Sequence, residues 1–533
     1  MLKCTINGKE LEVKPGTTII EAMYKADIRI AHYCYHPGLS IAGVCRLCMV
    51  EIDGNPRVQI ACNTMITEGM KINNTSEKVR ETVKWGLDFH LINHPLDCPI
   101  CDQAGECGLQ DQYMEYGKYD PEMAEPKQKK HKVVDLGPTV VLDSERCILC
   151  SRCVRFTDEV SKTNELGLFN RGDRTEIGTH EGVELNNKYS LNTVDICPVG
   201  ALTSKDFRFR QRVWYLKESD SICQGCSTGC NVKVYYNKEG MFRVKPRENQ
   251  EVNGHWMCDE GRDIYKFVNR DHRLLKGKRR TETGWTEEAA GQTAKYAGEV
   301  LKKTASDKIA LVLTGQNTVE EYESIIQTFV AQFKTKNIYH WVNNKETFEQ
   351  FDGILLRGDK NPNTKGLLKV MEQHGIQLAW GDLTQKLNAK GIETLVVVAP
   401  ENQGVFPDMA ARVAEFKNAK NLIWLSAGSN ALIDDLTSNG KANVNVLQIP
   451  LKTFVEKDGT FVNYKGKHQF FKKATIIVSE ALTLTEAADL FVGKNLRVEH
   501  SSTATFTDVH QRLDQVTIEN RKKNEFVYRR GSL

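Results

Sequence analysis

The chain has 533 residues, which is too long for a single hydrophobic core, so we expect about three to five domains. Its composition is ordinary for a soluble protein, with 40% hydrophobic and 26% charged residues. The formal net charge of +3 is close to neutral for this length and does not indicate a nucleic-acid partner, and no run of about 18 apolar residues predicts a membrane-spanning helix.

The start of the chain contains neither an apolar secretory segment nor the Arg- and Ser-rich composition of a transit peptide. We therefore expect the protein to stay in the compartment where it is made, with any link to a membrane provided by partner subunits. All 16 cysteines lie between Cys4 and Cys258. In a long chain without a secretory signal, closely spaced cysteines are more typical of metal or cluster ligands than of disulfides.

The first elements expected are a β-hairpin and a helix. Residues 1–13 have two strand-like runs around Asn7-Gly8, a pair that favours a two-residue type I′ turn. The segment from Thr18 to Glu21 has the capping-box pattern and predicts that a short helix begins there.

A cysteine-bearing loop, residues 34–48, and a predicted strand, residues 49–52, follow the helix. This order fits a small β-grasp domain, as in plant-type ferredoxins, over residues 1–78. Four cysteines with one C-x2-C pair after such a start suit a 2Fe–2S cluster, whereas a zinc site, the weaker alternative, usually carries two tight pairs. The expected ligands of this first set are Cys34, Cys45, Cys48 and Cys62.

A helix is predicted over residues 76–92, and a histidine and three cysteines follow in the segment 79–118. Three cysteines leave one corner of a 4Fe–4S cluster open, and the spacing H-x3-C-x2-C-x5-C favours a histidine there. A lone histidine is more often a packed or capping residue, and we assign that structural role to His90. The expected ligands of this second set are His94, Cys98, Cys101 and Cys107.

The segment 119–215 contains a C-x2-C-x2-C run and, further on, a Cys-Pro pair. Together these are the signature of bacterial ferredoxins and the most specific local signal in the chain. A second run of this kind is missing, so we expect one 4Fe–4S cluster here and not two. The expected ligands of this third set are Cys147, Cys150, Cys153 and Cys197.

A fourth set, C-x2-C-x3-C-x27-C, lies in the segment 216–272. By ligand count alone, zinc competes with a 4Fe–4S cluster. The sequence around residues 221–230 and 258–262 resembles the cluster domain of molybdopterin oxidoreductases and favours the cluster. The remaining cysteine, Cys4, is expected to be a small buried hydrophobe. The expected ligands of the fourth set are Cys223, Cys226, Cys230 and Cys258.

The last segment, residues 273–533, has a different pattern of hydrophobic residues. Short apolar runs at residues 309–313, 395–398 and 421–425 alternate with amphipathic stretches, which predicts a mostly parallel α/β sheet. The chain contains neither a G-x-G-x-x-G dinucleotide motif nor a Walker A motif, and no convincing catalytic triad or carboxylate pair. We therefore expect no catalytic residue and no dinucleotide site in this chain.

The order of the four ligand sets resembles that of the 75-kDa iron–sulfur subunit family of NADH:quinone oxidoreductases, the enzymes known as respiratory complex I. Residues 200–208, after the Cys-Pro pair, and residues 453–463 are also similar to the corresponding sequences of that family. The resemblance is close up to about residue 270 and looser beyond. It implies an overall multidomain fold, α+β and then α/β, that ends in a molybdopterin-oxidoreductase-like domain.

This resemblance also implies a path for electrons. They would come from a flavin-bearing, NADH-oxidising subunit, pass the 2Fe–2S site, the third set and then the second set, and leave to a ferredoxin-like 4Fe–4S subunit that leads towards the quinone-site subunits. The fourth set would hold an off-path cluster. The complex would lie peripherally on the cytoplasmic side of the bacterial inner membrane, attached through partner subunits.

Family members have a C-terminal part that looks like a molybdopterin enzyme without its cofactor, and many are longer than this chain. The lack of cysteine after residue 258 agrees with an absent molybdenum cofactor, although a Ser or Asp ligand stays open. Two alternatives remain: an electron-input subunit of an NAD-linked hydrogenase or formate dehydrogenase, and a zinc scaffold that holds partner proteins together.

Overall fold

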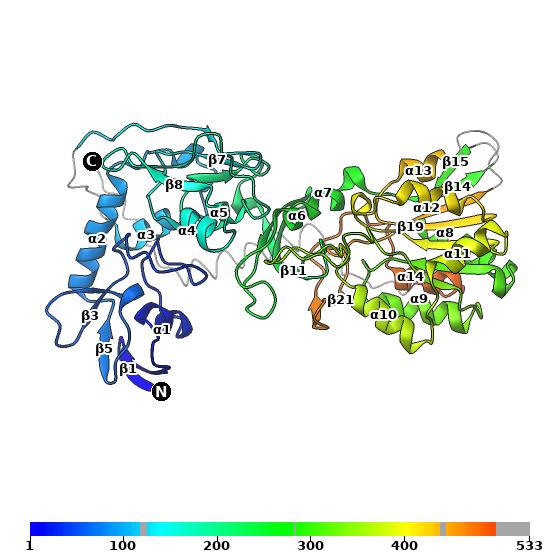
Figure 1. The fold of residues 1–533 in the computed structure, drawn as a ribbon, viewed down its shortest axis with the longest axis horizontal. Helices are drawn as coiled ribbons and strands as arrows, with labels where there is room; N and C mark the ends of the chain where they lie inside the picture. The colour runs from blue at the N-terminus through cyan, green and yellow to red at the C-terminus, as the bar shows by residue number, and fades with distance from the viewer. Residues whose placement is uncertain (118–124, 282–283, 437–443, 497–533) are drawn as a thin grey trace, which may run out of the picture.

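The computed structural model of the protein describes residues 1–117, 125–281, 284–436 and 444–496. The chain forms an N-terminal lobe, coloured blue to cyan, and a C-terminal lobe, coloured green to orange, with a smaller green unit between them (Figure 1). Among the described residues, no helix is both long and apolar enough to cross a bilayer.

The first domain is a five-stranded sheet in the order β2-β1-β5-β3-β4, in which β1 pairs in parallel with β5. The hairpin at its start is confirmed, with Asn7 (φ 52°) and Gly8 (φ 82°) both left-handed, as a type I′ turn requires. The capping box of Thr18 and Glu21 is also confirmed. The elements are β1 (Leu2–Ile6), β2 (Lys9–Val13), α1 (Ile19–Lys25), β3 (Met49–Ile52), β4 (Gln59–Ile60), η1 (Ala61–Asn63) and β5 (Met70–Asn73).

A helical segment lies against this sheet and confirms the predicted amphipathic helix. The Ser76 side chain caps its first turn by accepting from the Val79 N–H, and Val79, Val83 and Leu87 are buried on one face. The elements are α2 (Glu77–Leu91), η2 (Cys98–Ile100) and α3 (Gly108–Tyr116).

The next unit combines a three-stranded sheet, in the order β10-β7-β6, with the hairpin β8-β9 and two short helices. Its hydrophobic residues join those of α2 and of the first cysteine loop in one continuous core. The elements are β6 (Val134–Asp135), β7 (Val140–Leu142), α4 (Arg152–Glu159), β8 (Leu166–Phe169), β9 (Glu176–Thr179), α5 (Asn192–Asp195), β10 (Leu202–Ser204) and η3 (Val213–Tyr215).

The unit between the lobes is an antiparallel sheet, β11-β12-β13, followed by two helical turns. Its core is shared with the hairpin β21-β22, which comes more than 200 residues later in the chain. The elements are β11 (Lys217–Ile222), β12 (Asn231–Asn237), β13 (Gly240–Pro246), α6 (Asp259–Arg262), α7 (Ile264–Val268), η4 (Arg270–His272), β21 (Gly459–Val462) and β22 (His468–Phe471).

The C-terminal lobe contains a seven-stranded sheet in the order β15-β14-β20-β19-β18-β16-β17. The three apolar runs noted in the sequence form the parallel strands β16, β18 and β19, which confirms the expected α/β sheet, and an antiparallel hairpin, β14-β15, extends one edge. The strands are β14 (Gly277–Thr281), β15 (Gly284–Glu288), β16 (Ile309–Leu313), β17 (Ile338–His340), β18 (Thr394–Val398), β19 (Asn421–Ser426) and β20 (Asn445–Pro450).

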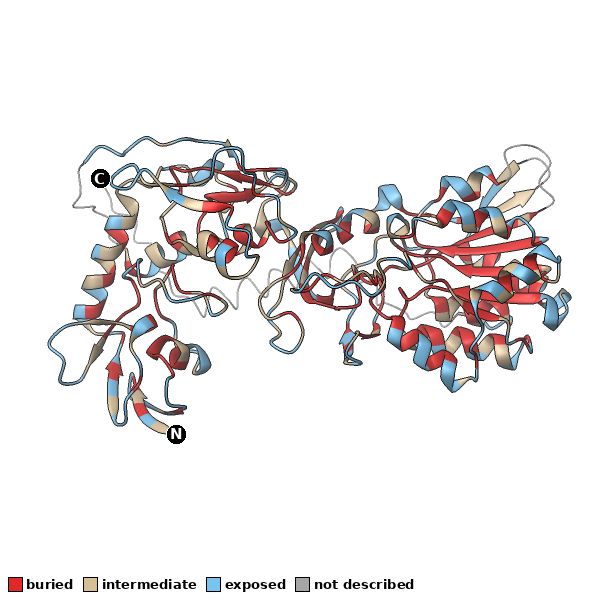
Figure 2. Ribbon diagram, viewed as in Figure 1, coloured by how far each residue is buried: buried red, intermediate tan, exposed pale blue. Residues whose placement is uncertain are grey.

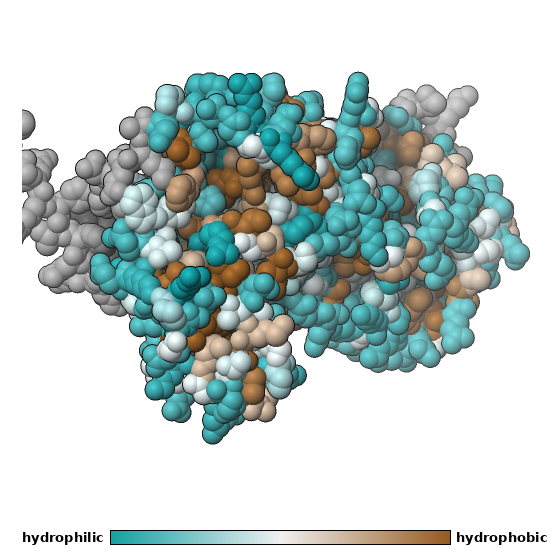
Figure 3. Space-filling model, turned by 60° about the vertical axis from the view of Figure 1, so that its left-hand side comes forward, coloured by the Kyte–Doolittle hydropathy of each residue, from teal (hydrophilic) through white to brown (hydrophobic). Residues whose placement is uncertain are grey.

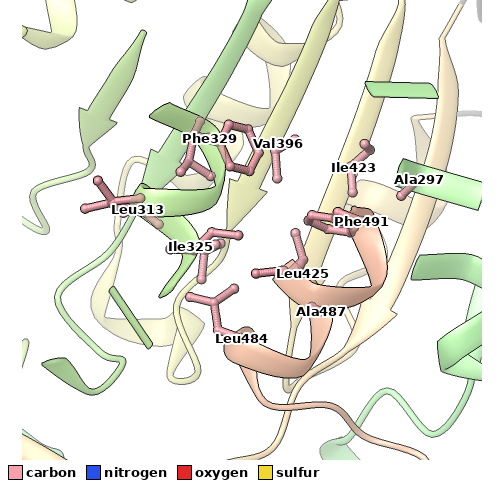
Figure 4. Packing of buried hydrophobic residues seen from close by; sticks show 14 of the residues in the cluster. Ala297, Leu313, Ile325, Phe329, Val396, Ile423, Leu425, Leu484, Ala487 and Phe491 are labelled. Atoms are coloured by element: carbon pink, nitrogen blue, oxygen red, sulfur yellow. The ribbon is translucent and has the colours of Figure 1, made fainter. Parts of the chain in front are cut away.

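Helices cover both faces of this sheet, and its central strands β16, β18 and β19 are entirely buried (Figure 2). On one face, Leu484, Ala487 and Phe491 of α14 pack near Ile423 and Leu425 of β19 (Figure 4). The helices α8, α9, α10 and α14 lie on that face and α11, α12 and α13 on the other. Their bounds are α8 (Ala290–Lys303), α9 (Val319–Ala331), α10 (Thr364–Gln373), α11 (Trp380–Asn388), α12 (Met409–Phe416), α13 (Ala431–Asp435) and α14 (Leu484–Phe491).

Candidate metal centres

The first set lies between the β-grasp sheet and the loop after α1, and all four cysteines are buried. Cys34 and Cys45 form one hydrogen-bonded thiol pair, and Cys48 and Cys62 form another. The hydrogen bond from Cys45 lowers the pKa of Cys34 to about 5 and raises that of Cys45 itself. Cationic iron would replace the protons of these paired thiols, so the donor set fits a 2Fe–2S cluster.

The second set surrounds a cavity of about 490 Å³, which His94, Cys98, Cys101 and Cys107 all line. The Nδ1 atom of His94 is buried and has no hydrogen-bond partner among the described residues. Burial lowers the pKa of His94 to about 4, so the ring is neutral at physiological pH, as a metal ligand must be. A buried, unpaired imidazole nitrogen beside three thiols fits the open corner of a 4Fe–4S cluster.

His90, one helical turn before His94, has a different environment. One ring nitrogen, Nε2, lies 3.1 Å from the carbonyl oxygen of Cys45, and the ring packs edge-on against Tyr33. These contacts tie α2 to the first cysteine loop, which agrees with the structural role expected from the sequence.

The third set encloses a small cavity of about 20 Å³ whose other walls are mostly apolar, with Leu142 and Ile177 among them. Burial raises the pKa of Cys147 to about 12 and that of Cys150 to about 11. These thiols therefore need a cation to become thiolates. The N–H of Leu149 donates to the Cys147 sulfur at 3.4 Å, and three backbone N–H groups hydrogen-bond to Cys197, a pattern that tunes the potential of an iron–sulfur cluster.

The fourth set is buried in the unit between the lobes. The N–H of Gly225 donates to the sulfur of Cys223 at 3.4 Å, and the N–H of Gly261 donates to that of Cys258 at 3.3 Å. A Cβ atom on Gly261 would come within 3.0 Å of the Cys223 sulfur, so glycine leaves the room that the sulfurs occupy. The arrangement is compatible with a 4Fe–4S cluster.

The turns between neighbouring cysteines are strained. Arg46, Leu149 and Ser151 have φ values of 54°, 55° and 60°, a left-handed conformation that residues with a Cβ atom adopt at a cost. Arg46 lies inside the C-x2-C pair of the first set, and Leu149 and Ser151 lie inside the C-x2-C-x2-C run of the third. Such strain persists where the surroundings impose it, which is typical of functional sites.

Four family models match the segments that carry these sets. The model described as "2Fe-2S iron-sulfur cluster binding domain" matches residues 1–77, and that described as "NADH-ubiquinone oxidoreductase-G iron-sulfur binding region" matches residues 86–121. "NADH-quinone oxidoreductase subunit 3, ferredoxin-like domain" matches residues 137–203, and "Molybdopterin oxidoreductase Fe4S4 domain" matches residues 216–270. The chain thus contains 2Fe–2S, 4Fe–4S and molybdopterin-oxidoreductase-type Fe4S4 domains.

Curated relatives agree with these matches. The G subunit of NADH-quinone oxidoreductase from Rickettsia conorii is 35% identical over 358 residues, which cover 66% of this chain and 51% of that protein. The resemblance to this iron–sulfur subunit of NADH-quinone oxidoreductase is confirmed. The 75 kDa subunit of NADH-ubiquinone oxidoreductase of Reclinomonas americana is 40% identical over 270 residues, 51% of this chain and 39% of that protein. The chain spans about half the length, or less, of these relatives.

Among solved structures, a chain in the crystal structure of an NAD+-reducing [NiFe]-hydrogenase in the H2-reduced state is 28% identical. The alignment covers 40% of this chain and 91% of that chain, with a TM-score of 0.37. A score this low carries no argument about function.

Sequence patterns did not reveal Arg146, which lines the cavity of the second set although it immediately precedes Cys147 of the third. Its guanidinium pairs with Asp97 at 3.0 Å, next to Cys98, so it joins the loops of two ligand sets. Adjacency to the C-x2-C-x2-C run was the only available signal, and it does not indicate which neighbouring loop the side chain reaches.

Gly200 is expected to be indispensable to the second set. A Cβ atom there would lie 2.2 Å from the Cys101 sulfur and 3.0 Å from the Gln103 Cβ, too close for either to stay in place. We expect Gly200→Ala to lose about four irons per chain, together with the EPR signal of that site. Gly381→Ala is the control, because a Cβ atom at Gly381 in α11 meets nothing within 4 Å. Full iron content with an unchanged signal in Gly200→Ala would contradict the expectation.

Proposed function

We propose that this chain is the iron–sulfur electron carrier of an NADH:quinone oxidoreductase, relaying electrons from a flavin subunit towards quinone. The observation that carries the proposal is the shared core of three ligand sets. Cys34, Cys107 and Cys150, from the first, second and third sets, belong to one continuous hydrophobic cluster. Cysteines of the fourth set belong to a different cluster, together with the hairpin β21-β22. Cys48 and Cys62 of the first set belong to the neighbouring cluster of the β-grasp sheet, and Cys98 of the second set is exposed. Ligands of three sets in a common core support a relay, and a fourth set with no ligand in that core supports an off-path site.

The order of the proposed relay is the first set, then the third, then the second. The loop after Cys197 of the third set lies against the second set, where the N–H of Gly108 donates to the Pro198 carbonyl at 2.9 Å and Gly200 faces Cys101. The first and third sets are in turn tied through α4, since Arg152 donates to the carbonyls of Tyr35 and Ile196. The third set therefore contacts both of the others.

The proposed exit is at the second set, where a ferredoxin-like 4Fe–4S subunit would dock. Cys98 is exposed, and its neighbours Leu96 and Ile100 are 89% and 63% exposed. Arg212 holds the segment of exposed Trp214 against this loop by donating to the Cys101 carbonyl at 2.6 Å. Apolar groups lie among polar ones on the face of the N-terminal lobe that comes forward in Figure 3. Exposed apolar side chains around a redox site support a partner that accepts the electron there.

The other proposed partners are the flavin/NADH-oxidising subunit and the quinone-site subunits. They would connect this chain to the cytoplasmic side of a bacterial inner membrane, with no nucleic acid involved. The proposed domains are residues 1–78, 79–118, 119–215, 216–272 and 273–533.

We further propose that the C-terminal domain carries no molybdenum cofactor and serves as a scaffold. In a doubly wound sheet, ligands bind where the strand order reverses, here at the carboxyl ends of β16 and β18. Side chains fill that crevice: the Gln316 side-chain oxygen accepts from the Glu401 N–H at 2.6 Å, and buried Lys457 pairs with Glu321 at 2.8 Å and with Glu401 at 3.5 Å. This packing supports the absence of a bound pterin.

Iron quantification and EPR on the purified chain or complex test the proposal. One 2Fe–2S and three 4Fe–4S clusters require about fourteen irons per chain. Among the described residues, no three His, Cys, Asp or Glu side chains form a site for a single metal ion. The measured iron-to-zinc ratio distinguishes iron–sulfur clusters from zinc. Abundant zinc with little iron would contradict the relay, and bound molybdenum would favour a formate dehydrogenase subunit.

A further inference from the structure

One arginine side chain bridges residues of the first and third ligand sets. Arg155 lies on α4, two residues after Cys153, and its Nη2 atom donates to the carbonyl oxygen of Cys34 at 2.5 Å. The same nitrogen lies 3.4 Å from the carbonyl oxygen of Cys150. Cys34 and Cys150 are expected ligands of two different clusters, so a single guanidinium connects the two sites.

The position of this guanidinium is fixed by further contacts. Its Nη1 atom donates to the carbonyl of Ser40, and its Nε atom donates to the Ser151 hydroxyl at 3.2 Å. Glu159, one turn further along α4, accepts from the Ser40 N–H at 2.8 Å and from the Ser40 hydroxyl. Hydrogen bonds therefore hold the loop around Ser40, in the first set, against α4, which begins inside the third set.

The groups that hydrogen-bond to Arg155 are uncharged. In the part of the chain that the structure describes, its hydrogen-bond partners are carbonyl and hydroxyl oxygens, and it forms no ion pair with a carboxylate. Its charge lies close to both sites, because the same Nη2 atom is 2.5 Å from the Cys34 carbonyl oxygen and 3.4 Å from that of Cys150. A positive charge at such a place favours the more negative, reduced state of a cluster.

We propose that Arg155 is the positioning residue for electron transfer between the first and third sites, through its bridge between Cys34 and Cys150 and through its charge. The inference rests on the proposed relay. In the step, one electron leaves the first site and enters the third. No covalent bond forms or breaks, and the guanidinium, protonated throughout, neither gains nor loses a proton. The hydrogen-bonded path from one ligand backbone to the other provides coupling that an empty gap would lack.

Two substitutions separate the bridge from the charge. Arg155→Lys keeps the charge but presents a compact ammonium in place of the fork that reaches several carbonyls. Arg155→Gln removes the charge. The control is Arg57→Gln, since Arg57 is an exposed arginine outside the ligand sets. All variants are to be studied as the assembled complex, with iron content, EPR-monitored redox titration and freeze-quench EPR after mixing with NADH.

We expect wild-type iron content in both Arg155 variants. In Arg155→Gln, the potentials of both sites should fall together. In Arg155→Lys, the potentials should stay close to those of the wild type, while reduction of the third site after the first should slow by about 10- to 100-fold. If Arg155→Gln loses iron, the transfer rate and the potentials of Arg155→Lys alone test the inference. Full iron with unchanged potentials and unchanged transfer rate would overturn the inference, whereas a wild-type complex without these iron signals would instead refute the relay itself.

Discussion

Replacing Cys150 by Ala is expected to abolish NADH-to-quinone electron flow in the assembled enzyme. Cys150 belongs to the third set, which contacts both the first set, through α4, and the second, through the loop after Cys197. A chain that lacks the third cluster would have no intermediate between the other two. The measurement is NADH-dependent quinone reduction by purified complex, with subunit composition checked on a native gel.

Cys226→Ala is the matched control, because it removes an expected ligand of the fourth set, which lies in the unit between the lobes. We expect this variant to lose the fourth cluster and some stability while much of the electron flow remains, since cluster binding is coupled to local folding. Complete loss of flow in a still-assembled Cys226→Ala enzyme would show that the fourth site is on the path. Wild-type flow in Cys150→Ala would remove the third site from it.

Arg273→Met is expected to cause a large loss of stability in the C-terminal half. The Arg273 and Glu456 side chains are completely buried and form an ion pair at 2.7 Å. Arg273 also donates to the carbonyl oxygens of Val268, Ala427 and Leu451. Removing the cation leaves three carbonyls without a donor and the buried Glu456 carboxylate without a counter-ion, although it still accepts from Thr453, Ile477 and Val478. The expected cost is about 3–5 kcal/mol.

Denaturant unfolding of the full chain, followed by tryptophan fluorescence, measures this loss. Trp341 and Trp424 are buried in the C-terminal lobe and report on it. The control is Lys420→Met, which removes an exposed ion pair with Glu393 and should change the free energy of unfolding by less than about 1 kcal/mol. An Arg273→Met variant as stable as this control would refute the importance of the buried pair.

Local sequence determined much of the structure, because the signals lay within a few residues of one another. Asn7-Gly8 predicted the hairpin turn, the pattern from Thr18 to Glu21 predicted the helix cap, and the apolar run at residues 309–313 predicted a buried parallel strand. The spacing of the cysteines also predicted four groups, each of which the fold brings together, with Cys98 as the one exposed member. Ligation itself stays a prediction until iron is measured.

The relations between the groups were decided only by the tertiary structure. No spacing rule indicates that Arg155 reaches the carbonyl of Cys34, 121 residues away, or that Gly200 faces the sulfur of Cys101. The hairpin β14-β15 and the filling of the sheet crevice by Lys457 were likewise absent from the sequence patterns. These features depend on which surfaces pack against each other after the local elements have formed. The sequence thus determined the four cysteine groups, and packing decided that ligands of three of them meet in one core, in which the fourth group has none.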